Sequence, residues 1–317
     1  MMNTKFKNIK WILITAFGLG YFVATATAGP EYGPGDELGA ADAVEAARPS
    51  SRWQPVEVDS SMPSSFRDRK PNVINRADAL YGVFDILCHS GRPLRVLQLG
   101  DSHVAGGDYP AAVRSTLEEA WGKAENDTAG YGIVYKYIAR NGATAAQFAT
   151  TDRMKQVAAA CPDLIILSFG TNECHGMGYR EELHRVQLED FYEMLCETCP
   201  EAIVMITTPP GDYLTSRRVT YVRRSKGGKR RRVVRSNSKV NPMSARCAAA
   251  LESFGAEHNL AVWDLNTIVG GDVAVRNWTA AHMMRPDRIH FTAEGYQLHG
   301  RLLGEAILHA YNDYLTH

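Results

Sequence analysis

The sequence has 317 residues, of which 45% are hydrophobic and 22% are charged. This balance is typical of a globular protein with a sizeable core, large enough for one α/β domain with extensions or for two small domains. The 35 basic and 35 acidic residues give a formal net charge of zero. Recruitment of nucleic acid or membrane by a general electrostatic field is therefore excluded, and a charged partner must be met by a local patch.

The first 28 residues have the pattern of a secretory signal peptide. Lys5, Lys7 and Lys10 precede an almost wholly apolar stretch at residues 11–23, and Ala26-Thr27-Ala28 fits a small-x-small cleavage site. We therefore predict a cleavable signal at residues 1–28 and a periplasmic or extracellular location. The alternative is an N-terminal membrane anchor, for which the apolar stretch is short.

The next segment, residues 29–65, is rich in Gly, Ala, Pro, Asp and Ser and has no sustained period. It is predicted to be a flexible leader ahead of a domain spanning residues 66–317. Export permits disulfides. Six cysteines allow several pairings between which the sequence does not choose, namely Cys88, Cys161, Cys174, Cys196, Cys199 and Cys247.

From residue 72 onward, segments with helical spacing alternate with short apolar runs. This alternation predicts a parallel sheet covered by helices on both faces. The predicted helices lie at residues 72–88, 110–121, 151–160, 181–199, 242–258 and 292–315, and the predicted strands at residues 94–99, 131–139, 164–168, 202–207 and 260–265.

A basic insertion at residues 217–235 interrupts this alternation with ten basic residues and no acidic one. Valine-rich runs flank Gly227-Gly228, which is a turn signal, so we predict an inserted β-hairpin. Its charge could attract an anionic glycan, phospholipid head groups or nucleic acid, although export argues against nucleic acid. Arg230, Arg231 and Arg232 are the candidate substrate-binding residues. The alternative is a solvated hairpin whose charges only block edge pairing.

Small polar residues follow two of the predicted buried strands. Gly100-Asp101-Ser102-His103 comes directly after the first strand, and Gly170-Thr171-Asn172-Glu173 comes after the strand at residues 164–168. The carboxyl edge of an open α/β sheet is where ligands bind, so Ser102 is a candidate nucleophile. A nucleophilic serine requires a base, an orienting acid and donors for an oxyanion.

The base and the acid are predicted near the C-terminus. Asp287 and His290 are three residues apart just ahead of the last helix, so the carboxylate can hold one imidazole nitrogen while the other faces a serine. His103 is a rival base, and Cys174 is a rival nucleophile after the strand at residues 164–168. Ser102 with His290 has the better context.

Taken together, these motifs resemble the four blocks of the SGNH, or GDSL-type, serine hydrolases. Ser102 lies in GDSH, with His103 where many members have Leu, and Asn141-Gly142-Ala143 matches the second block. GTNE at residues 170–173 matches the third block, and DRIH at residues 287–290 matches the fourth. The resemblance runs from about Leu94 to Leu315 and leaves out the leader and the basic hairpin.

The resemblance implies a flavodoxin-like three-layer αβα fold with a central parallel sheet, commonly ordered 2-1-3-4-5. It also implies that Ser102, His290 and Asp287 are catalytic. The oxyanion hole would be formed by the backbone N–H groups of Ser102 and Gly142 and by the side-chain amide of Asn172. No cofactor and no metal site are expected.

The function predicted on these grounds is that of an exported serine esterase, similar to bacterial peptidoglycan O-acetylesterases, which removes O-acyl groups, acetyl in particular, from a carbohydrate. The expected partner is an O-acylated glycan, with an anionic polymer at the hairpin, no nucleic acid, and no membrane span after cleavage of the signal. One alternative is a lipase, lysophospholipase or thioesterase of the same fold. Another is a non-catalytic glycan-binding protein of the cell envelope.

Overall fold

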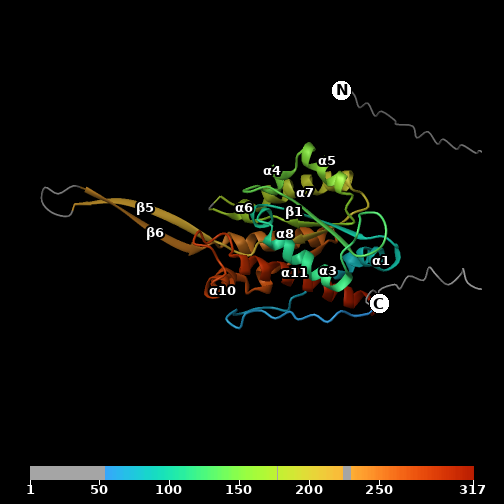
Figure 1. Ribbon diagram of the computed structural model, residues 1–317. Helices are drawn as coiled ribbons and strands as arrows, with labels where there is room; N and C mark the ends of the chain where they lie inside the picture. The colour runs from blue at the N-terminus through green and yellow to red at the C-terminus, as the bar shows by residue number, and fades with distance from the viewer. Residues whose placement is uncertain (1–53, 177, 224–229) are drawn as a thin grey trace, which may run out of the picture. The chain divides into compact units, whose positions relative to one another are not determined.

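The computed structural model describes residues 54–176, 178–223 and 230–317 (Figure 1). The predicted signal peptide, the leader as far as residue 53 and the Gly227-Gly228 turn lie outside the described residues. Among the helices of the described residues, none is long and apolar enough to cross a bilayer.

Five parallel strands form the central sheet in the order β2-β1-β3-β4-β7. This is the 2-1-3-4-5 order that the family resemblance implies, and the predicted fold class is confirmed. The last strand is shorter than predicted, because the side chain of Asp264 accepts a hydrogen bond from the Thr267 N–H and begins a short helix. The strands are β1 (Leu94–Gly100), β2 (Ile133–Ala139), β3 (Leu164–Ser168), β4 (Ile203–Thr207) and β7 (Ala261–Trp263).

Helices cover both faces of the sheet because the strands alternate between two apolar clusters. In β1, Val96 packs into one cluster and Leu97 into the other. The first cluster contains residues of α1 (Tyr81–His89), α3 (Asp108–Trp121), α10 (Ala274–Ala280) and α11 (Ala293–Tyr314). The second contains residues of α4 (Ala145–Phe148), α5 (Thr151–Ala160), α7 (Glu181–Thr198) and α8 (Met243–Glu257). In Figure 1, α3 and α11 lie on the opposite side of the sheet from α4, α5 and α7.

The first predicted helix begins later than its apolar spacing indicates. Asn75 forms an antiparallel bridge with Val262, and Arg76 has a left-handed φ of 55°. Helical structure therefore starts only with the 3-10 turn η2 (Ala77–Leu80) and continues into α1. The segment ahead of it extends the edge of the sheet beside β7.

A row of buried polar side chains crosses the sheet near its carboxyl edge. Gln98 on β1 accepts a hydrogen bond from the Tyr135 hydroxyl on β2 (2.8 Å) and donates to Ser168 on β3 (2.9 Å). The Thr207 hydroxyl on β4 lies 3.1 Å from the Ser168 oxygen. These bonds satisfy polar groups that would otherwise be buried at a cost, and they tie four strands together directly below the edge where the candidate site lies.

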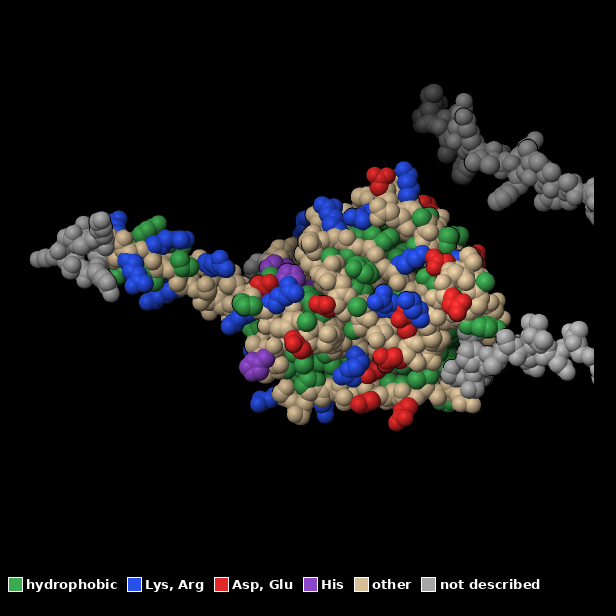
Figure 2. All heavy atoms as spheres, viewed as in Figure 1, with side chains coloured by type: hydrophobic (Ala, Val, Ile, Leu, Met, Phe, Trp, Pro, Cys, Tyr) green, Lys and Arg blue, Asp and Glu red, His purple; other side chains and the backbone are tan. Residues whose placement is uncertain are grey.

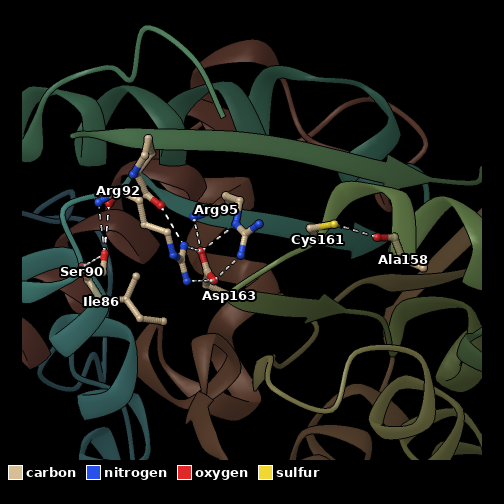
Figure 3. Close-up of polar contacts among 8 residues, drawn as sticks. Ile86, Ser90, Arg92, Arg95, Ala158, Cys161 and Asp163 are labelled. Atoms are coloured by element: carbon tan, nitrogen blue, oxygen red, sulfur yellow. Dashed lines mark hydrogen bonds and ion pairs between the residues drawn. The ribbon is translucent and has the colours of Figure 1, made fainter. Parts of the chain in front are cut away.

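The amino-terminal edge of the sheet is held by one carboxylate (Figure 3). Asp163 accepts hydrogen bonds from the guanidinium groups of Arg92 and Arg95, with N···O distances of 2.8 Å to each. Burial alone would raise the pKa of Asp163, but the two arginines lower it to about 2. The pair of arginines therefore fixes the start of β1 beside β3, at the opposite end of the strands from Ser102.

The predicted leader is shorter than the sequence indicates. Val56 exchanges two backbone hydrogen bonds with the Asn312 side chain, each of 2.8 Å, and Arg301 donates to the carbonyl oxygens of Asp59 and Ser61. Val56, Val58 and Met62 also pack against the first cluster. Residues 56–62, which we expected in a flexible leader, are therefore fixed along α11, because their hydrogen-bond partners come from the far end of the chain.

The basic insertion forms a two-stranded antiparallel sheet, β5 (Tyr213–Arg223) with β6 (Arg230–Val240). The predicted hairpin is confirmed, and it extends beyond residues 217–235 at both ends. Figure 1 shows it reaching away from the helices and the central sheet, and Figure 2 shows Lys and Arg side chains along it. Arg218 lies directly opposite Arg235 in this register, a like-charge pair that destabilises the hairpin.

Candidate active site

A pocket of about 490 Å³ opens at the carboxyl edge of the central sheet. The strand order changes direction between β1 and β3, and open α/β sheets bind their ligands at such a point. Loops that follow β1, β2 and β3 meet there with the loop ahead of α11. The described residues that line the pocket are Ser102, Ala105, Gly106, Asn141, Gly142, Thr171, Asn172, His175, Arg285, Ile289 and His290.

Ser102, His290 and Asp287 form one hydrogen-bonded chain at this pocket. The Nε2 atom of His290 lies 2.9 Å from Oγ of Ser102, and the Nδ1 atom lies 3.0 Å from Oδ2 of Asp287. Ser102 and His290 are 188 residues apart in the sequence. The fold thus brings together the serine predicted after the first strand and the acid and histidine predicted ahead of the last helix, at a distance at which an imidazole can take a hydroxyl proton.

A sharp turn from β1 into α2 (Ser102–Ala105) presents the serine. Gly100 is required in this turn because a Cβ there would lie 2.3 Å from the Val104 side chain. The side chain of Asp101 caps α2 by accepting a hydrogen bond from the His103 N–H (2.9 Å). Ser102 is the first residue of α2, so its own N–H has no acceptor within the helix.

Backbone hydrogen bonds hold the loop that carries Asp287 and His290. The Arg285 N–H donates to the His290 carbonyl (2.8 Å), and Oδ1 of Asp287 accepts from the N–H groups of Ile289 and His290 at 2.9 Å each. Burial alone would raise the pKa of Asp287, but these donors and the His290 side chain lower it below its ordinary value. Asp287 is therefore kept as a carboxylate that orients the imidazole.

Within the described residues, two of the three predicted oxyanion donors have N–H groups without an acceptor, whereas the third donor already makes hydrogen bonds. Gly142 adopts a left-handed φ of 71°, and its N–H has no acceptor in the described part of the chain. The amide nitrogen of Asn172 already donates to Oδ2 of Asp101 and to the carbonyl of Ala143, both at 3.0 Å. An oxyanion can therefore accept from Asn172 only by sharing or replacing one of these bonds.

Glu173 connects the second and third sequence blocks, a role that sequence analysis missed. Its carboxylate accepts hydrogen bonds from the N–H groups of Ala145 (2.7 Å) and Gly170 (2.9 Å). These two hydrogen bonds, together with the bond from Asn172 to Ala143, fix the Gly142 turn beside the end of β3. Burial raises the pKa of Glu173 to about 7, against the lowering effect of the Ala145 N–H. The sequence does carry a signal for this role: an acidic residue, Glu173, three positions after the glycine that follows the strand, which is the spacing of a capping box.

Asp101 is buried below the serine and does not line the pocket. Burial raises the pKa of Asp101 to about 7, although hydrogen bonds from the His103 N–H and from Asn172 lower it. Its two carboxyl oxygens bind the start of α2 and the amide of Asn172. It therefore positions two predicted donors at once.

His103, the rival base, points into the core. It is 5% exposed, its Nδ1 atom lies 3.0 Å from the Tyr296 hydroxyl, and its ring lies against His290 and Phe291. Burial lowers the pKa of His103 to about 3, so the ring is neutral. Its place in GDSH is explained by packing behind His290. The rival nucleophile, Cys174, is buried and donates to the Thr171 carbonyl.

Two further side chains at the pocket were not predicted. Arg285 is exposed and lines the pocket beside Ile289. His175 follows the end of α6 (Thr171–Cys174), and its Nδ1 atom pairs with the buried carboxylate of Asp212. The GTNE motif draws attention to residues 170–173, and nothing in the sequence links His175 with an acid 37 residues downstream.

The predicted substrate-binding arginines lie elsewhere. Arg230, Arg231 and Arg232 are exposed on β6 and are not among the residues that line the pocket. Across the described residues, no group of three or more His, Cys, Asp or Glu side chains could hold a metal ion. All six cysteines are described, and no disulfide joins any of them.

Comparison with known proteins places this geometry in a family. No curated protein sequence matches the chain. A solved structure of a peptidoglycan O-acetylesterase has a TM-score of 0.57 at 15% identity, covering 77% of this chain and 99% of that one. A lipase/acylhydrolase from Enterococcus faecalis has a TM-score of 0.44 at 18% identity (68% and 96% covered). A two-domain esterase active on acetylated mannans has a TM-score of 0.47 at 15% identity (77% and 55% covered).

The structural likeness to the first of these proteins shows a shared fold, which is that of the SGNH hydrolases. The family model of the GDSL-like lipase/acylhydrolases matches residues 99–298, which is more than half of the chain and includes all four sequence blocks. The chain belongs to the GDSL-like lipase/acylhydrolase family and is a carboxylic ester hydrolase.

Proposed function

We propose that this chain is an exported serine esterase that removes O-acyl groups, acetyl in particular, from a carbohydrate, with Ser102, His290 and Asp287 as its catalytic residues. The observation that carries the proposal is the unbroken chain of hydrogen bonds from Asp287 through His290 to Ser102 at the wall of the pocket. The family supplies the class of reaction, and this geometry supports the assignment of roles.

In the proposed mechanism, Ser102 Oγ attacks the ester carbonyl while His290 Nε2 takes the hydroxyl proton. Asp287 holds Nδ1–H and stabilises the imidazolium that forms. The C–O bond to the sugar breaks, and His290 returns the proton to the departing sugar oxygen. Water then attacks the acyl-serine by the same route, which releases the carboxylic acid and restores Ser102.

The negative charge that develops on the carbonyl oxygen is assigned to three donors. The N–H groups of Ser102 and Gly142 are unoccupied by protein acceptors in the described residues, and Asn172 shares a hydrogen that now binds Asp101 or Ala143. Each donor of this kind typically contributes about 100- to 1,000-fold in rate. Asp101 and Glu173 act through Asn172 and the Gly142 turn, so we regard them as positioning residues.

A small acyl group suits the composition of the pocket. Ala105, Gly106 and Gly142 leave room beside the serine, and most other described lining residues are polar. Ile289 is the only large aliphatic side chain among them. A long acyl chain needs an extended apolar surface to leave water, at about 0.8 kcal/mol per CH₂. The lining therefore supports acetyl over a fatty acyl chain.

The basic hairpin supports a polymeric, anionic substrate or matrix. Its exposed arginines include Arg230, Arg231 and Arg232, and it carries Arg218 opposite Arg235 without an acidic residue to offset the repulsion. A polyanion would relieve that repulsion and release its own counterions. We assign the hairpin to retention on an acidic glycan, which raises the local concentration of acetyl esters at the pocket.

The test is acetate release from O-acetylated peptidoglycan, acetylated mannan and acetylated xylan, with Ser102→Ala measured beside the wild type. The proposal expects release from at least one glycan and none above background from Ser102→Ala. If the wild type and Ser102→Ala bound the glycan equally and had the same biological function, the non-catalytic glycan-binding alternative would be favoured.

Acyl length separates the proposal from the lipase and thioesterase alternatives. The wild type should hydrolyse p-nitrophenyl acetate with a higher kcat/KM than p-nitrophenyl palmitate. A clear preference for palmitate would contradict the acetylesterase assignment, since it would require an apolar acyl channel. The same assay with an acetyl thioester tests the thioesterase alternative.

Export is part of the proposal and depends on residues 1–28, which lie outside the described residues. Expression of the full chain in a bacterial host, followed by N-terminal sequencing of the secreted or periplasmic protein, should give a mature start at Gly29. Retention of residues 1–28 in a membrane fraction would favour the N-terminal anchor.

A further inference from the structure

A second aspartate–histidine pair, Asp212 and His175, lies at the pocket and comes from segments outside the DRIH loop. His175 lines the pocket and is 38% exposed, whereas its partner Asp212 is 2% exposed. The Nδ1 atom of His175 is bonded to Oδ2 of Asp212. No partner for Nε2 of His175 is found among the described residues, so this nitrogen is available to a molecule in the pocket.

The surroundings of Asp212 fix it as an acceptor. Its other oxygen, Oδ1, accepts hydrogen bonds from the Asn241 amide (2.8 Å) and the Ser244 hydroxyl (2.7 Å). An ionised carboxylate oxygen can only accept, so with Asp212 as the carboxylate the hydrogen between Asp212 and His175 lies on Nδ1. In the neutral imidazole, Nε2 then carries a lone pair and is a hydrogen-bond acceptor.

The pair lies at the base of the basic hairpin, which we call the hairpin root and define as Asp212, Tyr213 and Asn241. Asp212 precedes β5 and Asn241 follows β6, and the Asn241 N–H donates to the Asp212 carbonyl (3.0 Å). The Asn241 amide also donates to the carbonyl of Cys174, next to His175 (3.0 Å). The contacts that close the hairpin thus also set the position of the His175 ring.

The root contacts the DRIH loop as well. The Tyr213 N–H donates to the Arg288 carbonyl (3.0 Å), and the Arg288 guanidinium lies 5.2 Å from the centre of the Tyr213 ring. Arg288 stands between Asp287 and His290 in the sequence. His175 and the loop that carries His290 are therefore both anchored to the same two-residue segment, Asp212-Tyr213.

We propose that His175 is a substrate-binding residue whose Nε2 accepts a hydrogen bond from a hydroxyl group of the sugar that carries the scissile ester. This inference rests on the proposed function and names a contact that distinguishes a sugar ester from a simple ester. Asp212 is the positioning residue that fixes the tautomer. The hairpin root thereby connects retention of the polymer with orientation of one of its sugars at Ser102.

The arrangement favours a substrate contact over a second catalytic base. Ser102 Oγ is bonded to His290, and the described residues show no hydrogen bond between His175 and Ser102. If the Nε2 acceptor is removed, the sugar hydroxyl in the pocket is left without a hydrogen-bond partner, and specificity for the sugar ester falls. A simple ester has no such hydroxyl, so its hydrolysis does not depend on this contact.

The first test compares His175→Ala with the wild type on acetylated mannan oligosaccharides, O-acetylated peptidoglycan fragments and p-nitrophenyl acetate. We expect His175→Ala to lower kcat/KM for the acetylated sugar about tenfold more than for p-nitrophenyl acetate, chiefly through KM. His258→Ala is the matched control, because His258 also pairs with a carboxylate, Glu189 at 3.0 Å, but does not line the pocket.

Equal losses on the sugar ester and on p-nitrophenyl acetate, or the same selective loss in His258→Ala, would overturn the inference while leaving the proposed function intact. Failure of the wild type to release acetate from any acetylated sugar would overturn the proposed function and this inference together. The two failures are therefore distinguishable from the wild-type measurement alone.

Asp212→Asn tests the tautomer. The Asn oxygen can still accept from Asn241 and Ser244, while its NH₂ group would donate to Nδ1 and move the ring hydrogen to Nε2. We expect the same selective loss as in His175→Ala, with the tautomer change seen in the ¹⁵N chemical shifts of His175. Unchanged selectivity with a changed tautomer would overturn the inference. If this variant does not fold, His175→Ala, which changes a partly exposed side chain, decides alone.

Discussion

The two aspartate–histidine pairs at the pocket are built in opposite ways. Asp287 and His290 come from one loop, three residues apart, and the acid is 46% exposed. Asp212 and His175 are 37 residues apart, and the acid is 2% exposed and bonded to Asn241 and Ser244. Among the described residues, the first pair is hydrogen-bonded to Ser102 and the second is not. Under the proposed function, the first pair transfers protons while the second holds a fixed orientation.

The largest expected effect comes from removing the acid of the first pair. Asp287→Asn would present an NH₂ group to Nδ1 and favour the wrong imidazole tautomer for accepting the Ser102 proton. We expect kcat to fall by about 10³- to 10⁴-fold on every ester, p-nitrophenyl acetate included. Stopped assays with purified variants would show this. If Asp212→Asn instead caused the larger loss on p-nitrophenyl acetate, the assignment of the two pairs would be reversed.

The next effect concerns Asn172, which also lines the pocket. Asn172→Ala should lower kcat by about 100- to 1,000-fold on both sugar esters and p-nitrophenyl acetate, with little change in KM, because an oxyanion donor acts in the transition state. Asn126→Ala, in an exposed loop, is the control. A loss of less than threefold would mean that the bonds to Asp101 and Ala143 occupy Asn172 throughout the reaction.

Asp101 is a third acid near the pocket, and like Asp212 it is buried, in contrast to the partly exposed Asp287. Its pKa is raised from 3.8 to about 7 by burial, so the folded state favours its protonated form. The free energy of unfolding of the wild type, relative to that of Asp101→Asn, should therefore fall by up to about 4 kcal/mol as the pH rises from 3.8 to about 7. Buried His103 and His184, whose pKa values are lowered, act in the opposite direction, but they cancel in this difference.

Urea unfolding of both proteins across this pH range measures the effect. A constant difference between wild type and variant would show that Asp101 keeps an ordinary pKa in the folded protein. Glu173→Gln should give a similar trend from a starting pKa of 4.5.

The smallest effect is expected at the outer end of the hairpin, far along the strands from the Asp212 root. Replacing Arg230, Arg231 and Arg232 together by Gln should weaken retention on an anionic polymer such as heparin and flatten the salt dependence of binding by about three counterions. The kcat on p-nitrophenyl acetate should stay within about twofold, since none of the three lines the pocket.

The control for the hairpin variant replaces three exposed basic residues of the helices by Gln, namely Arg114, Lys155 and Arg185. It removes the same charge from the other part of the molecule. If retention on the polymer were weakened equally in both variants, the alternative would be favoured, in which the hairpin is solvated and its charges only block edge pairing.

The sequence predicts those features that depend on local pattern. Alternating apolar strands and helices predict the sheet, and Ser102, Gly142, Asn172 and His290 each stand in a short motif at a strand or helix end. The local pair Asp287–His290 is visible for the same reason. The hairpin is visible because its charge and its glycines are contiguous.

What the sequence does not predict depends on contacts between distant segments. The pairing of His175 with Asp212 requires knowledge of where β4 ends relative to α6. The docking of residues 56–62 on α11 depends on Asn312 and Arg301, more than 230 residues away. The occupied amide of Asn172 is equally invisible, since Asp101 and Ala143 approach it only in the folded chain.

The central claim is that Ser102 carries the acyl group. The most direct measurement is rapid acid quench of the enzyme during turnover of an acetyl ester, followed by mass spectrometry of the peptide that contains Ser102. The account predicts an acetyl group on Ser102 in the wild type, and neither this adduct nor acetate release in Ser102→Ala. Acetylation of another residue, or acetate release that persists in Ser102→Ala, would contradict it.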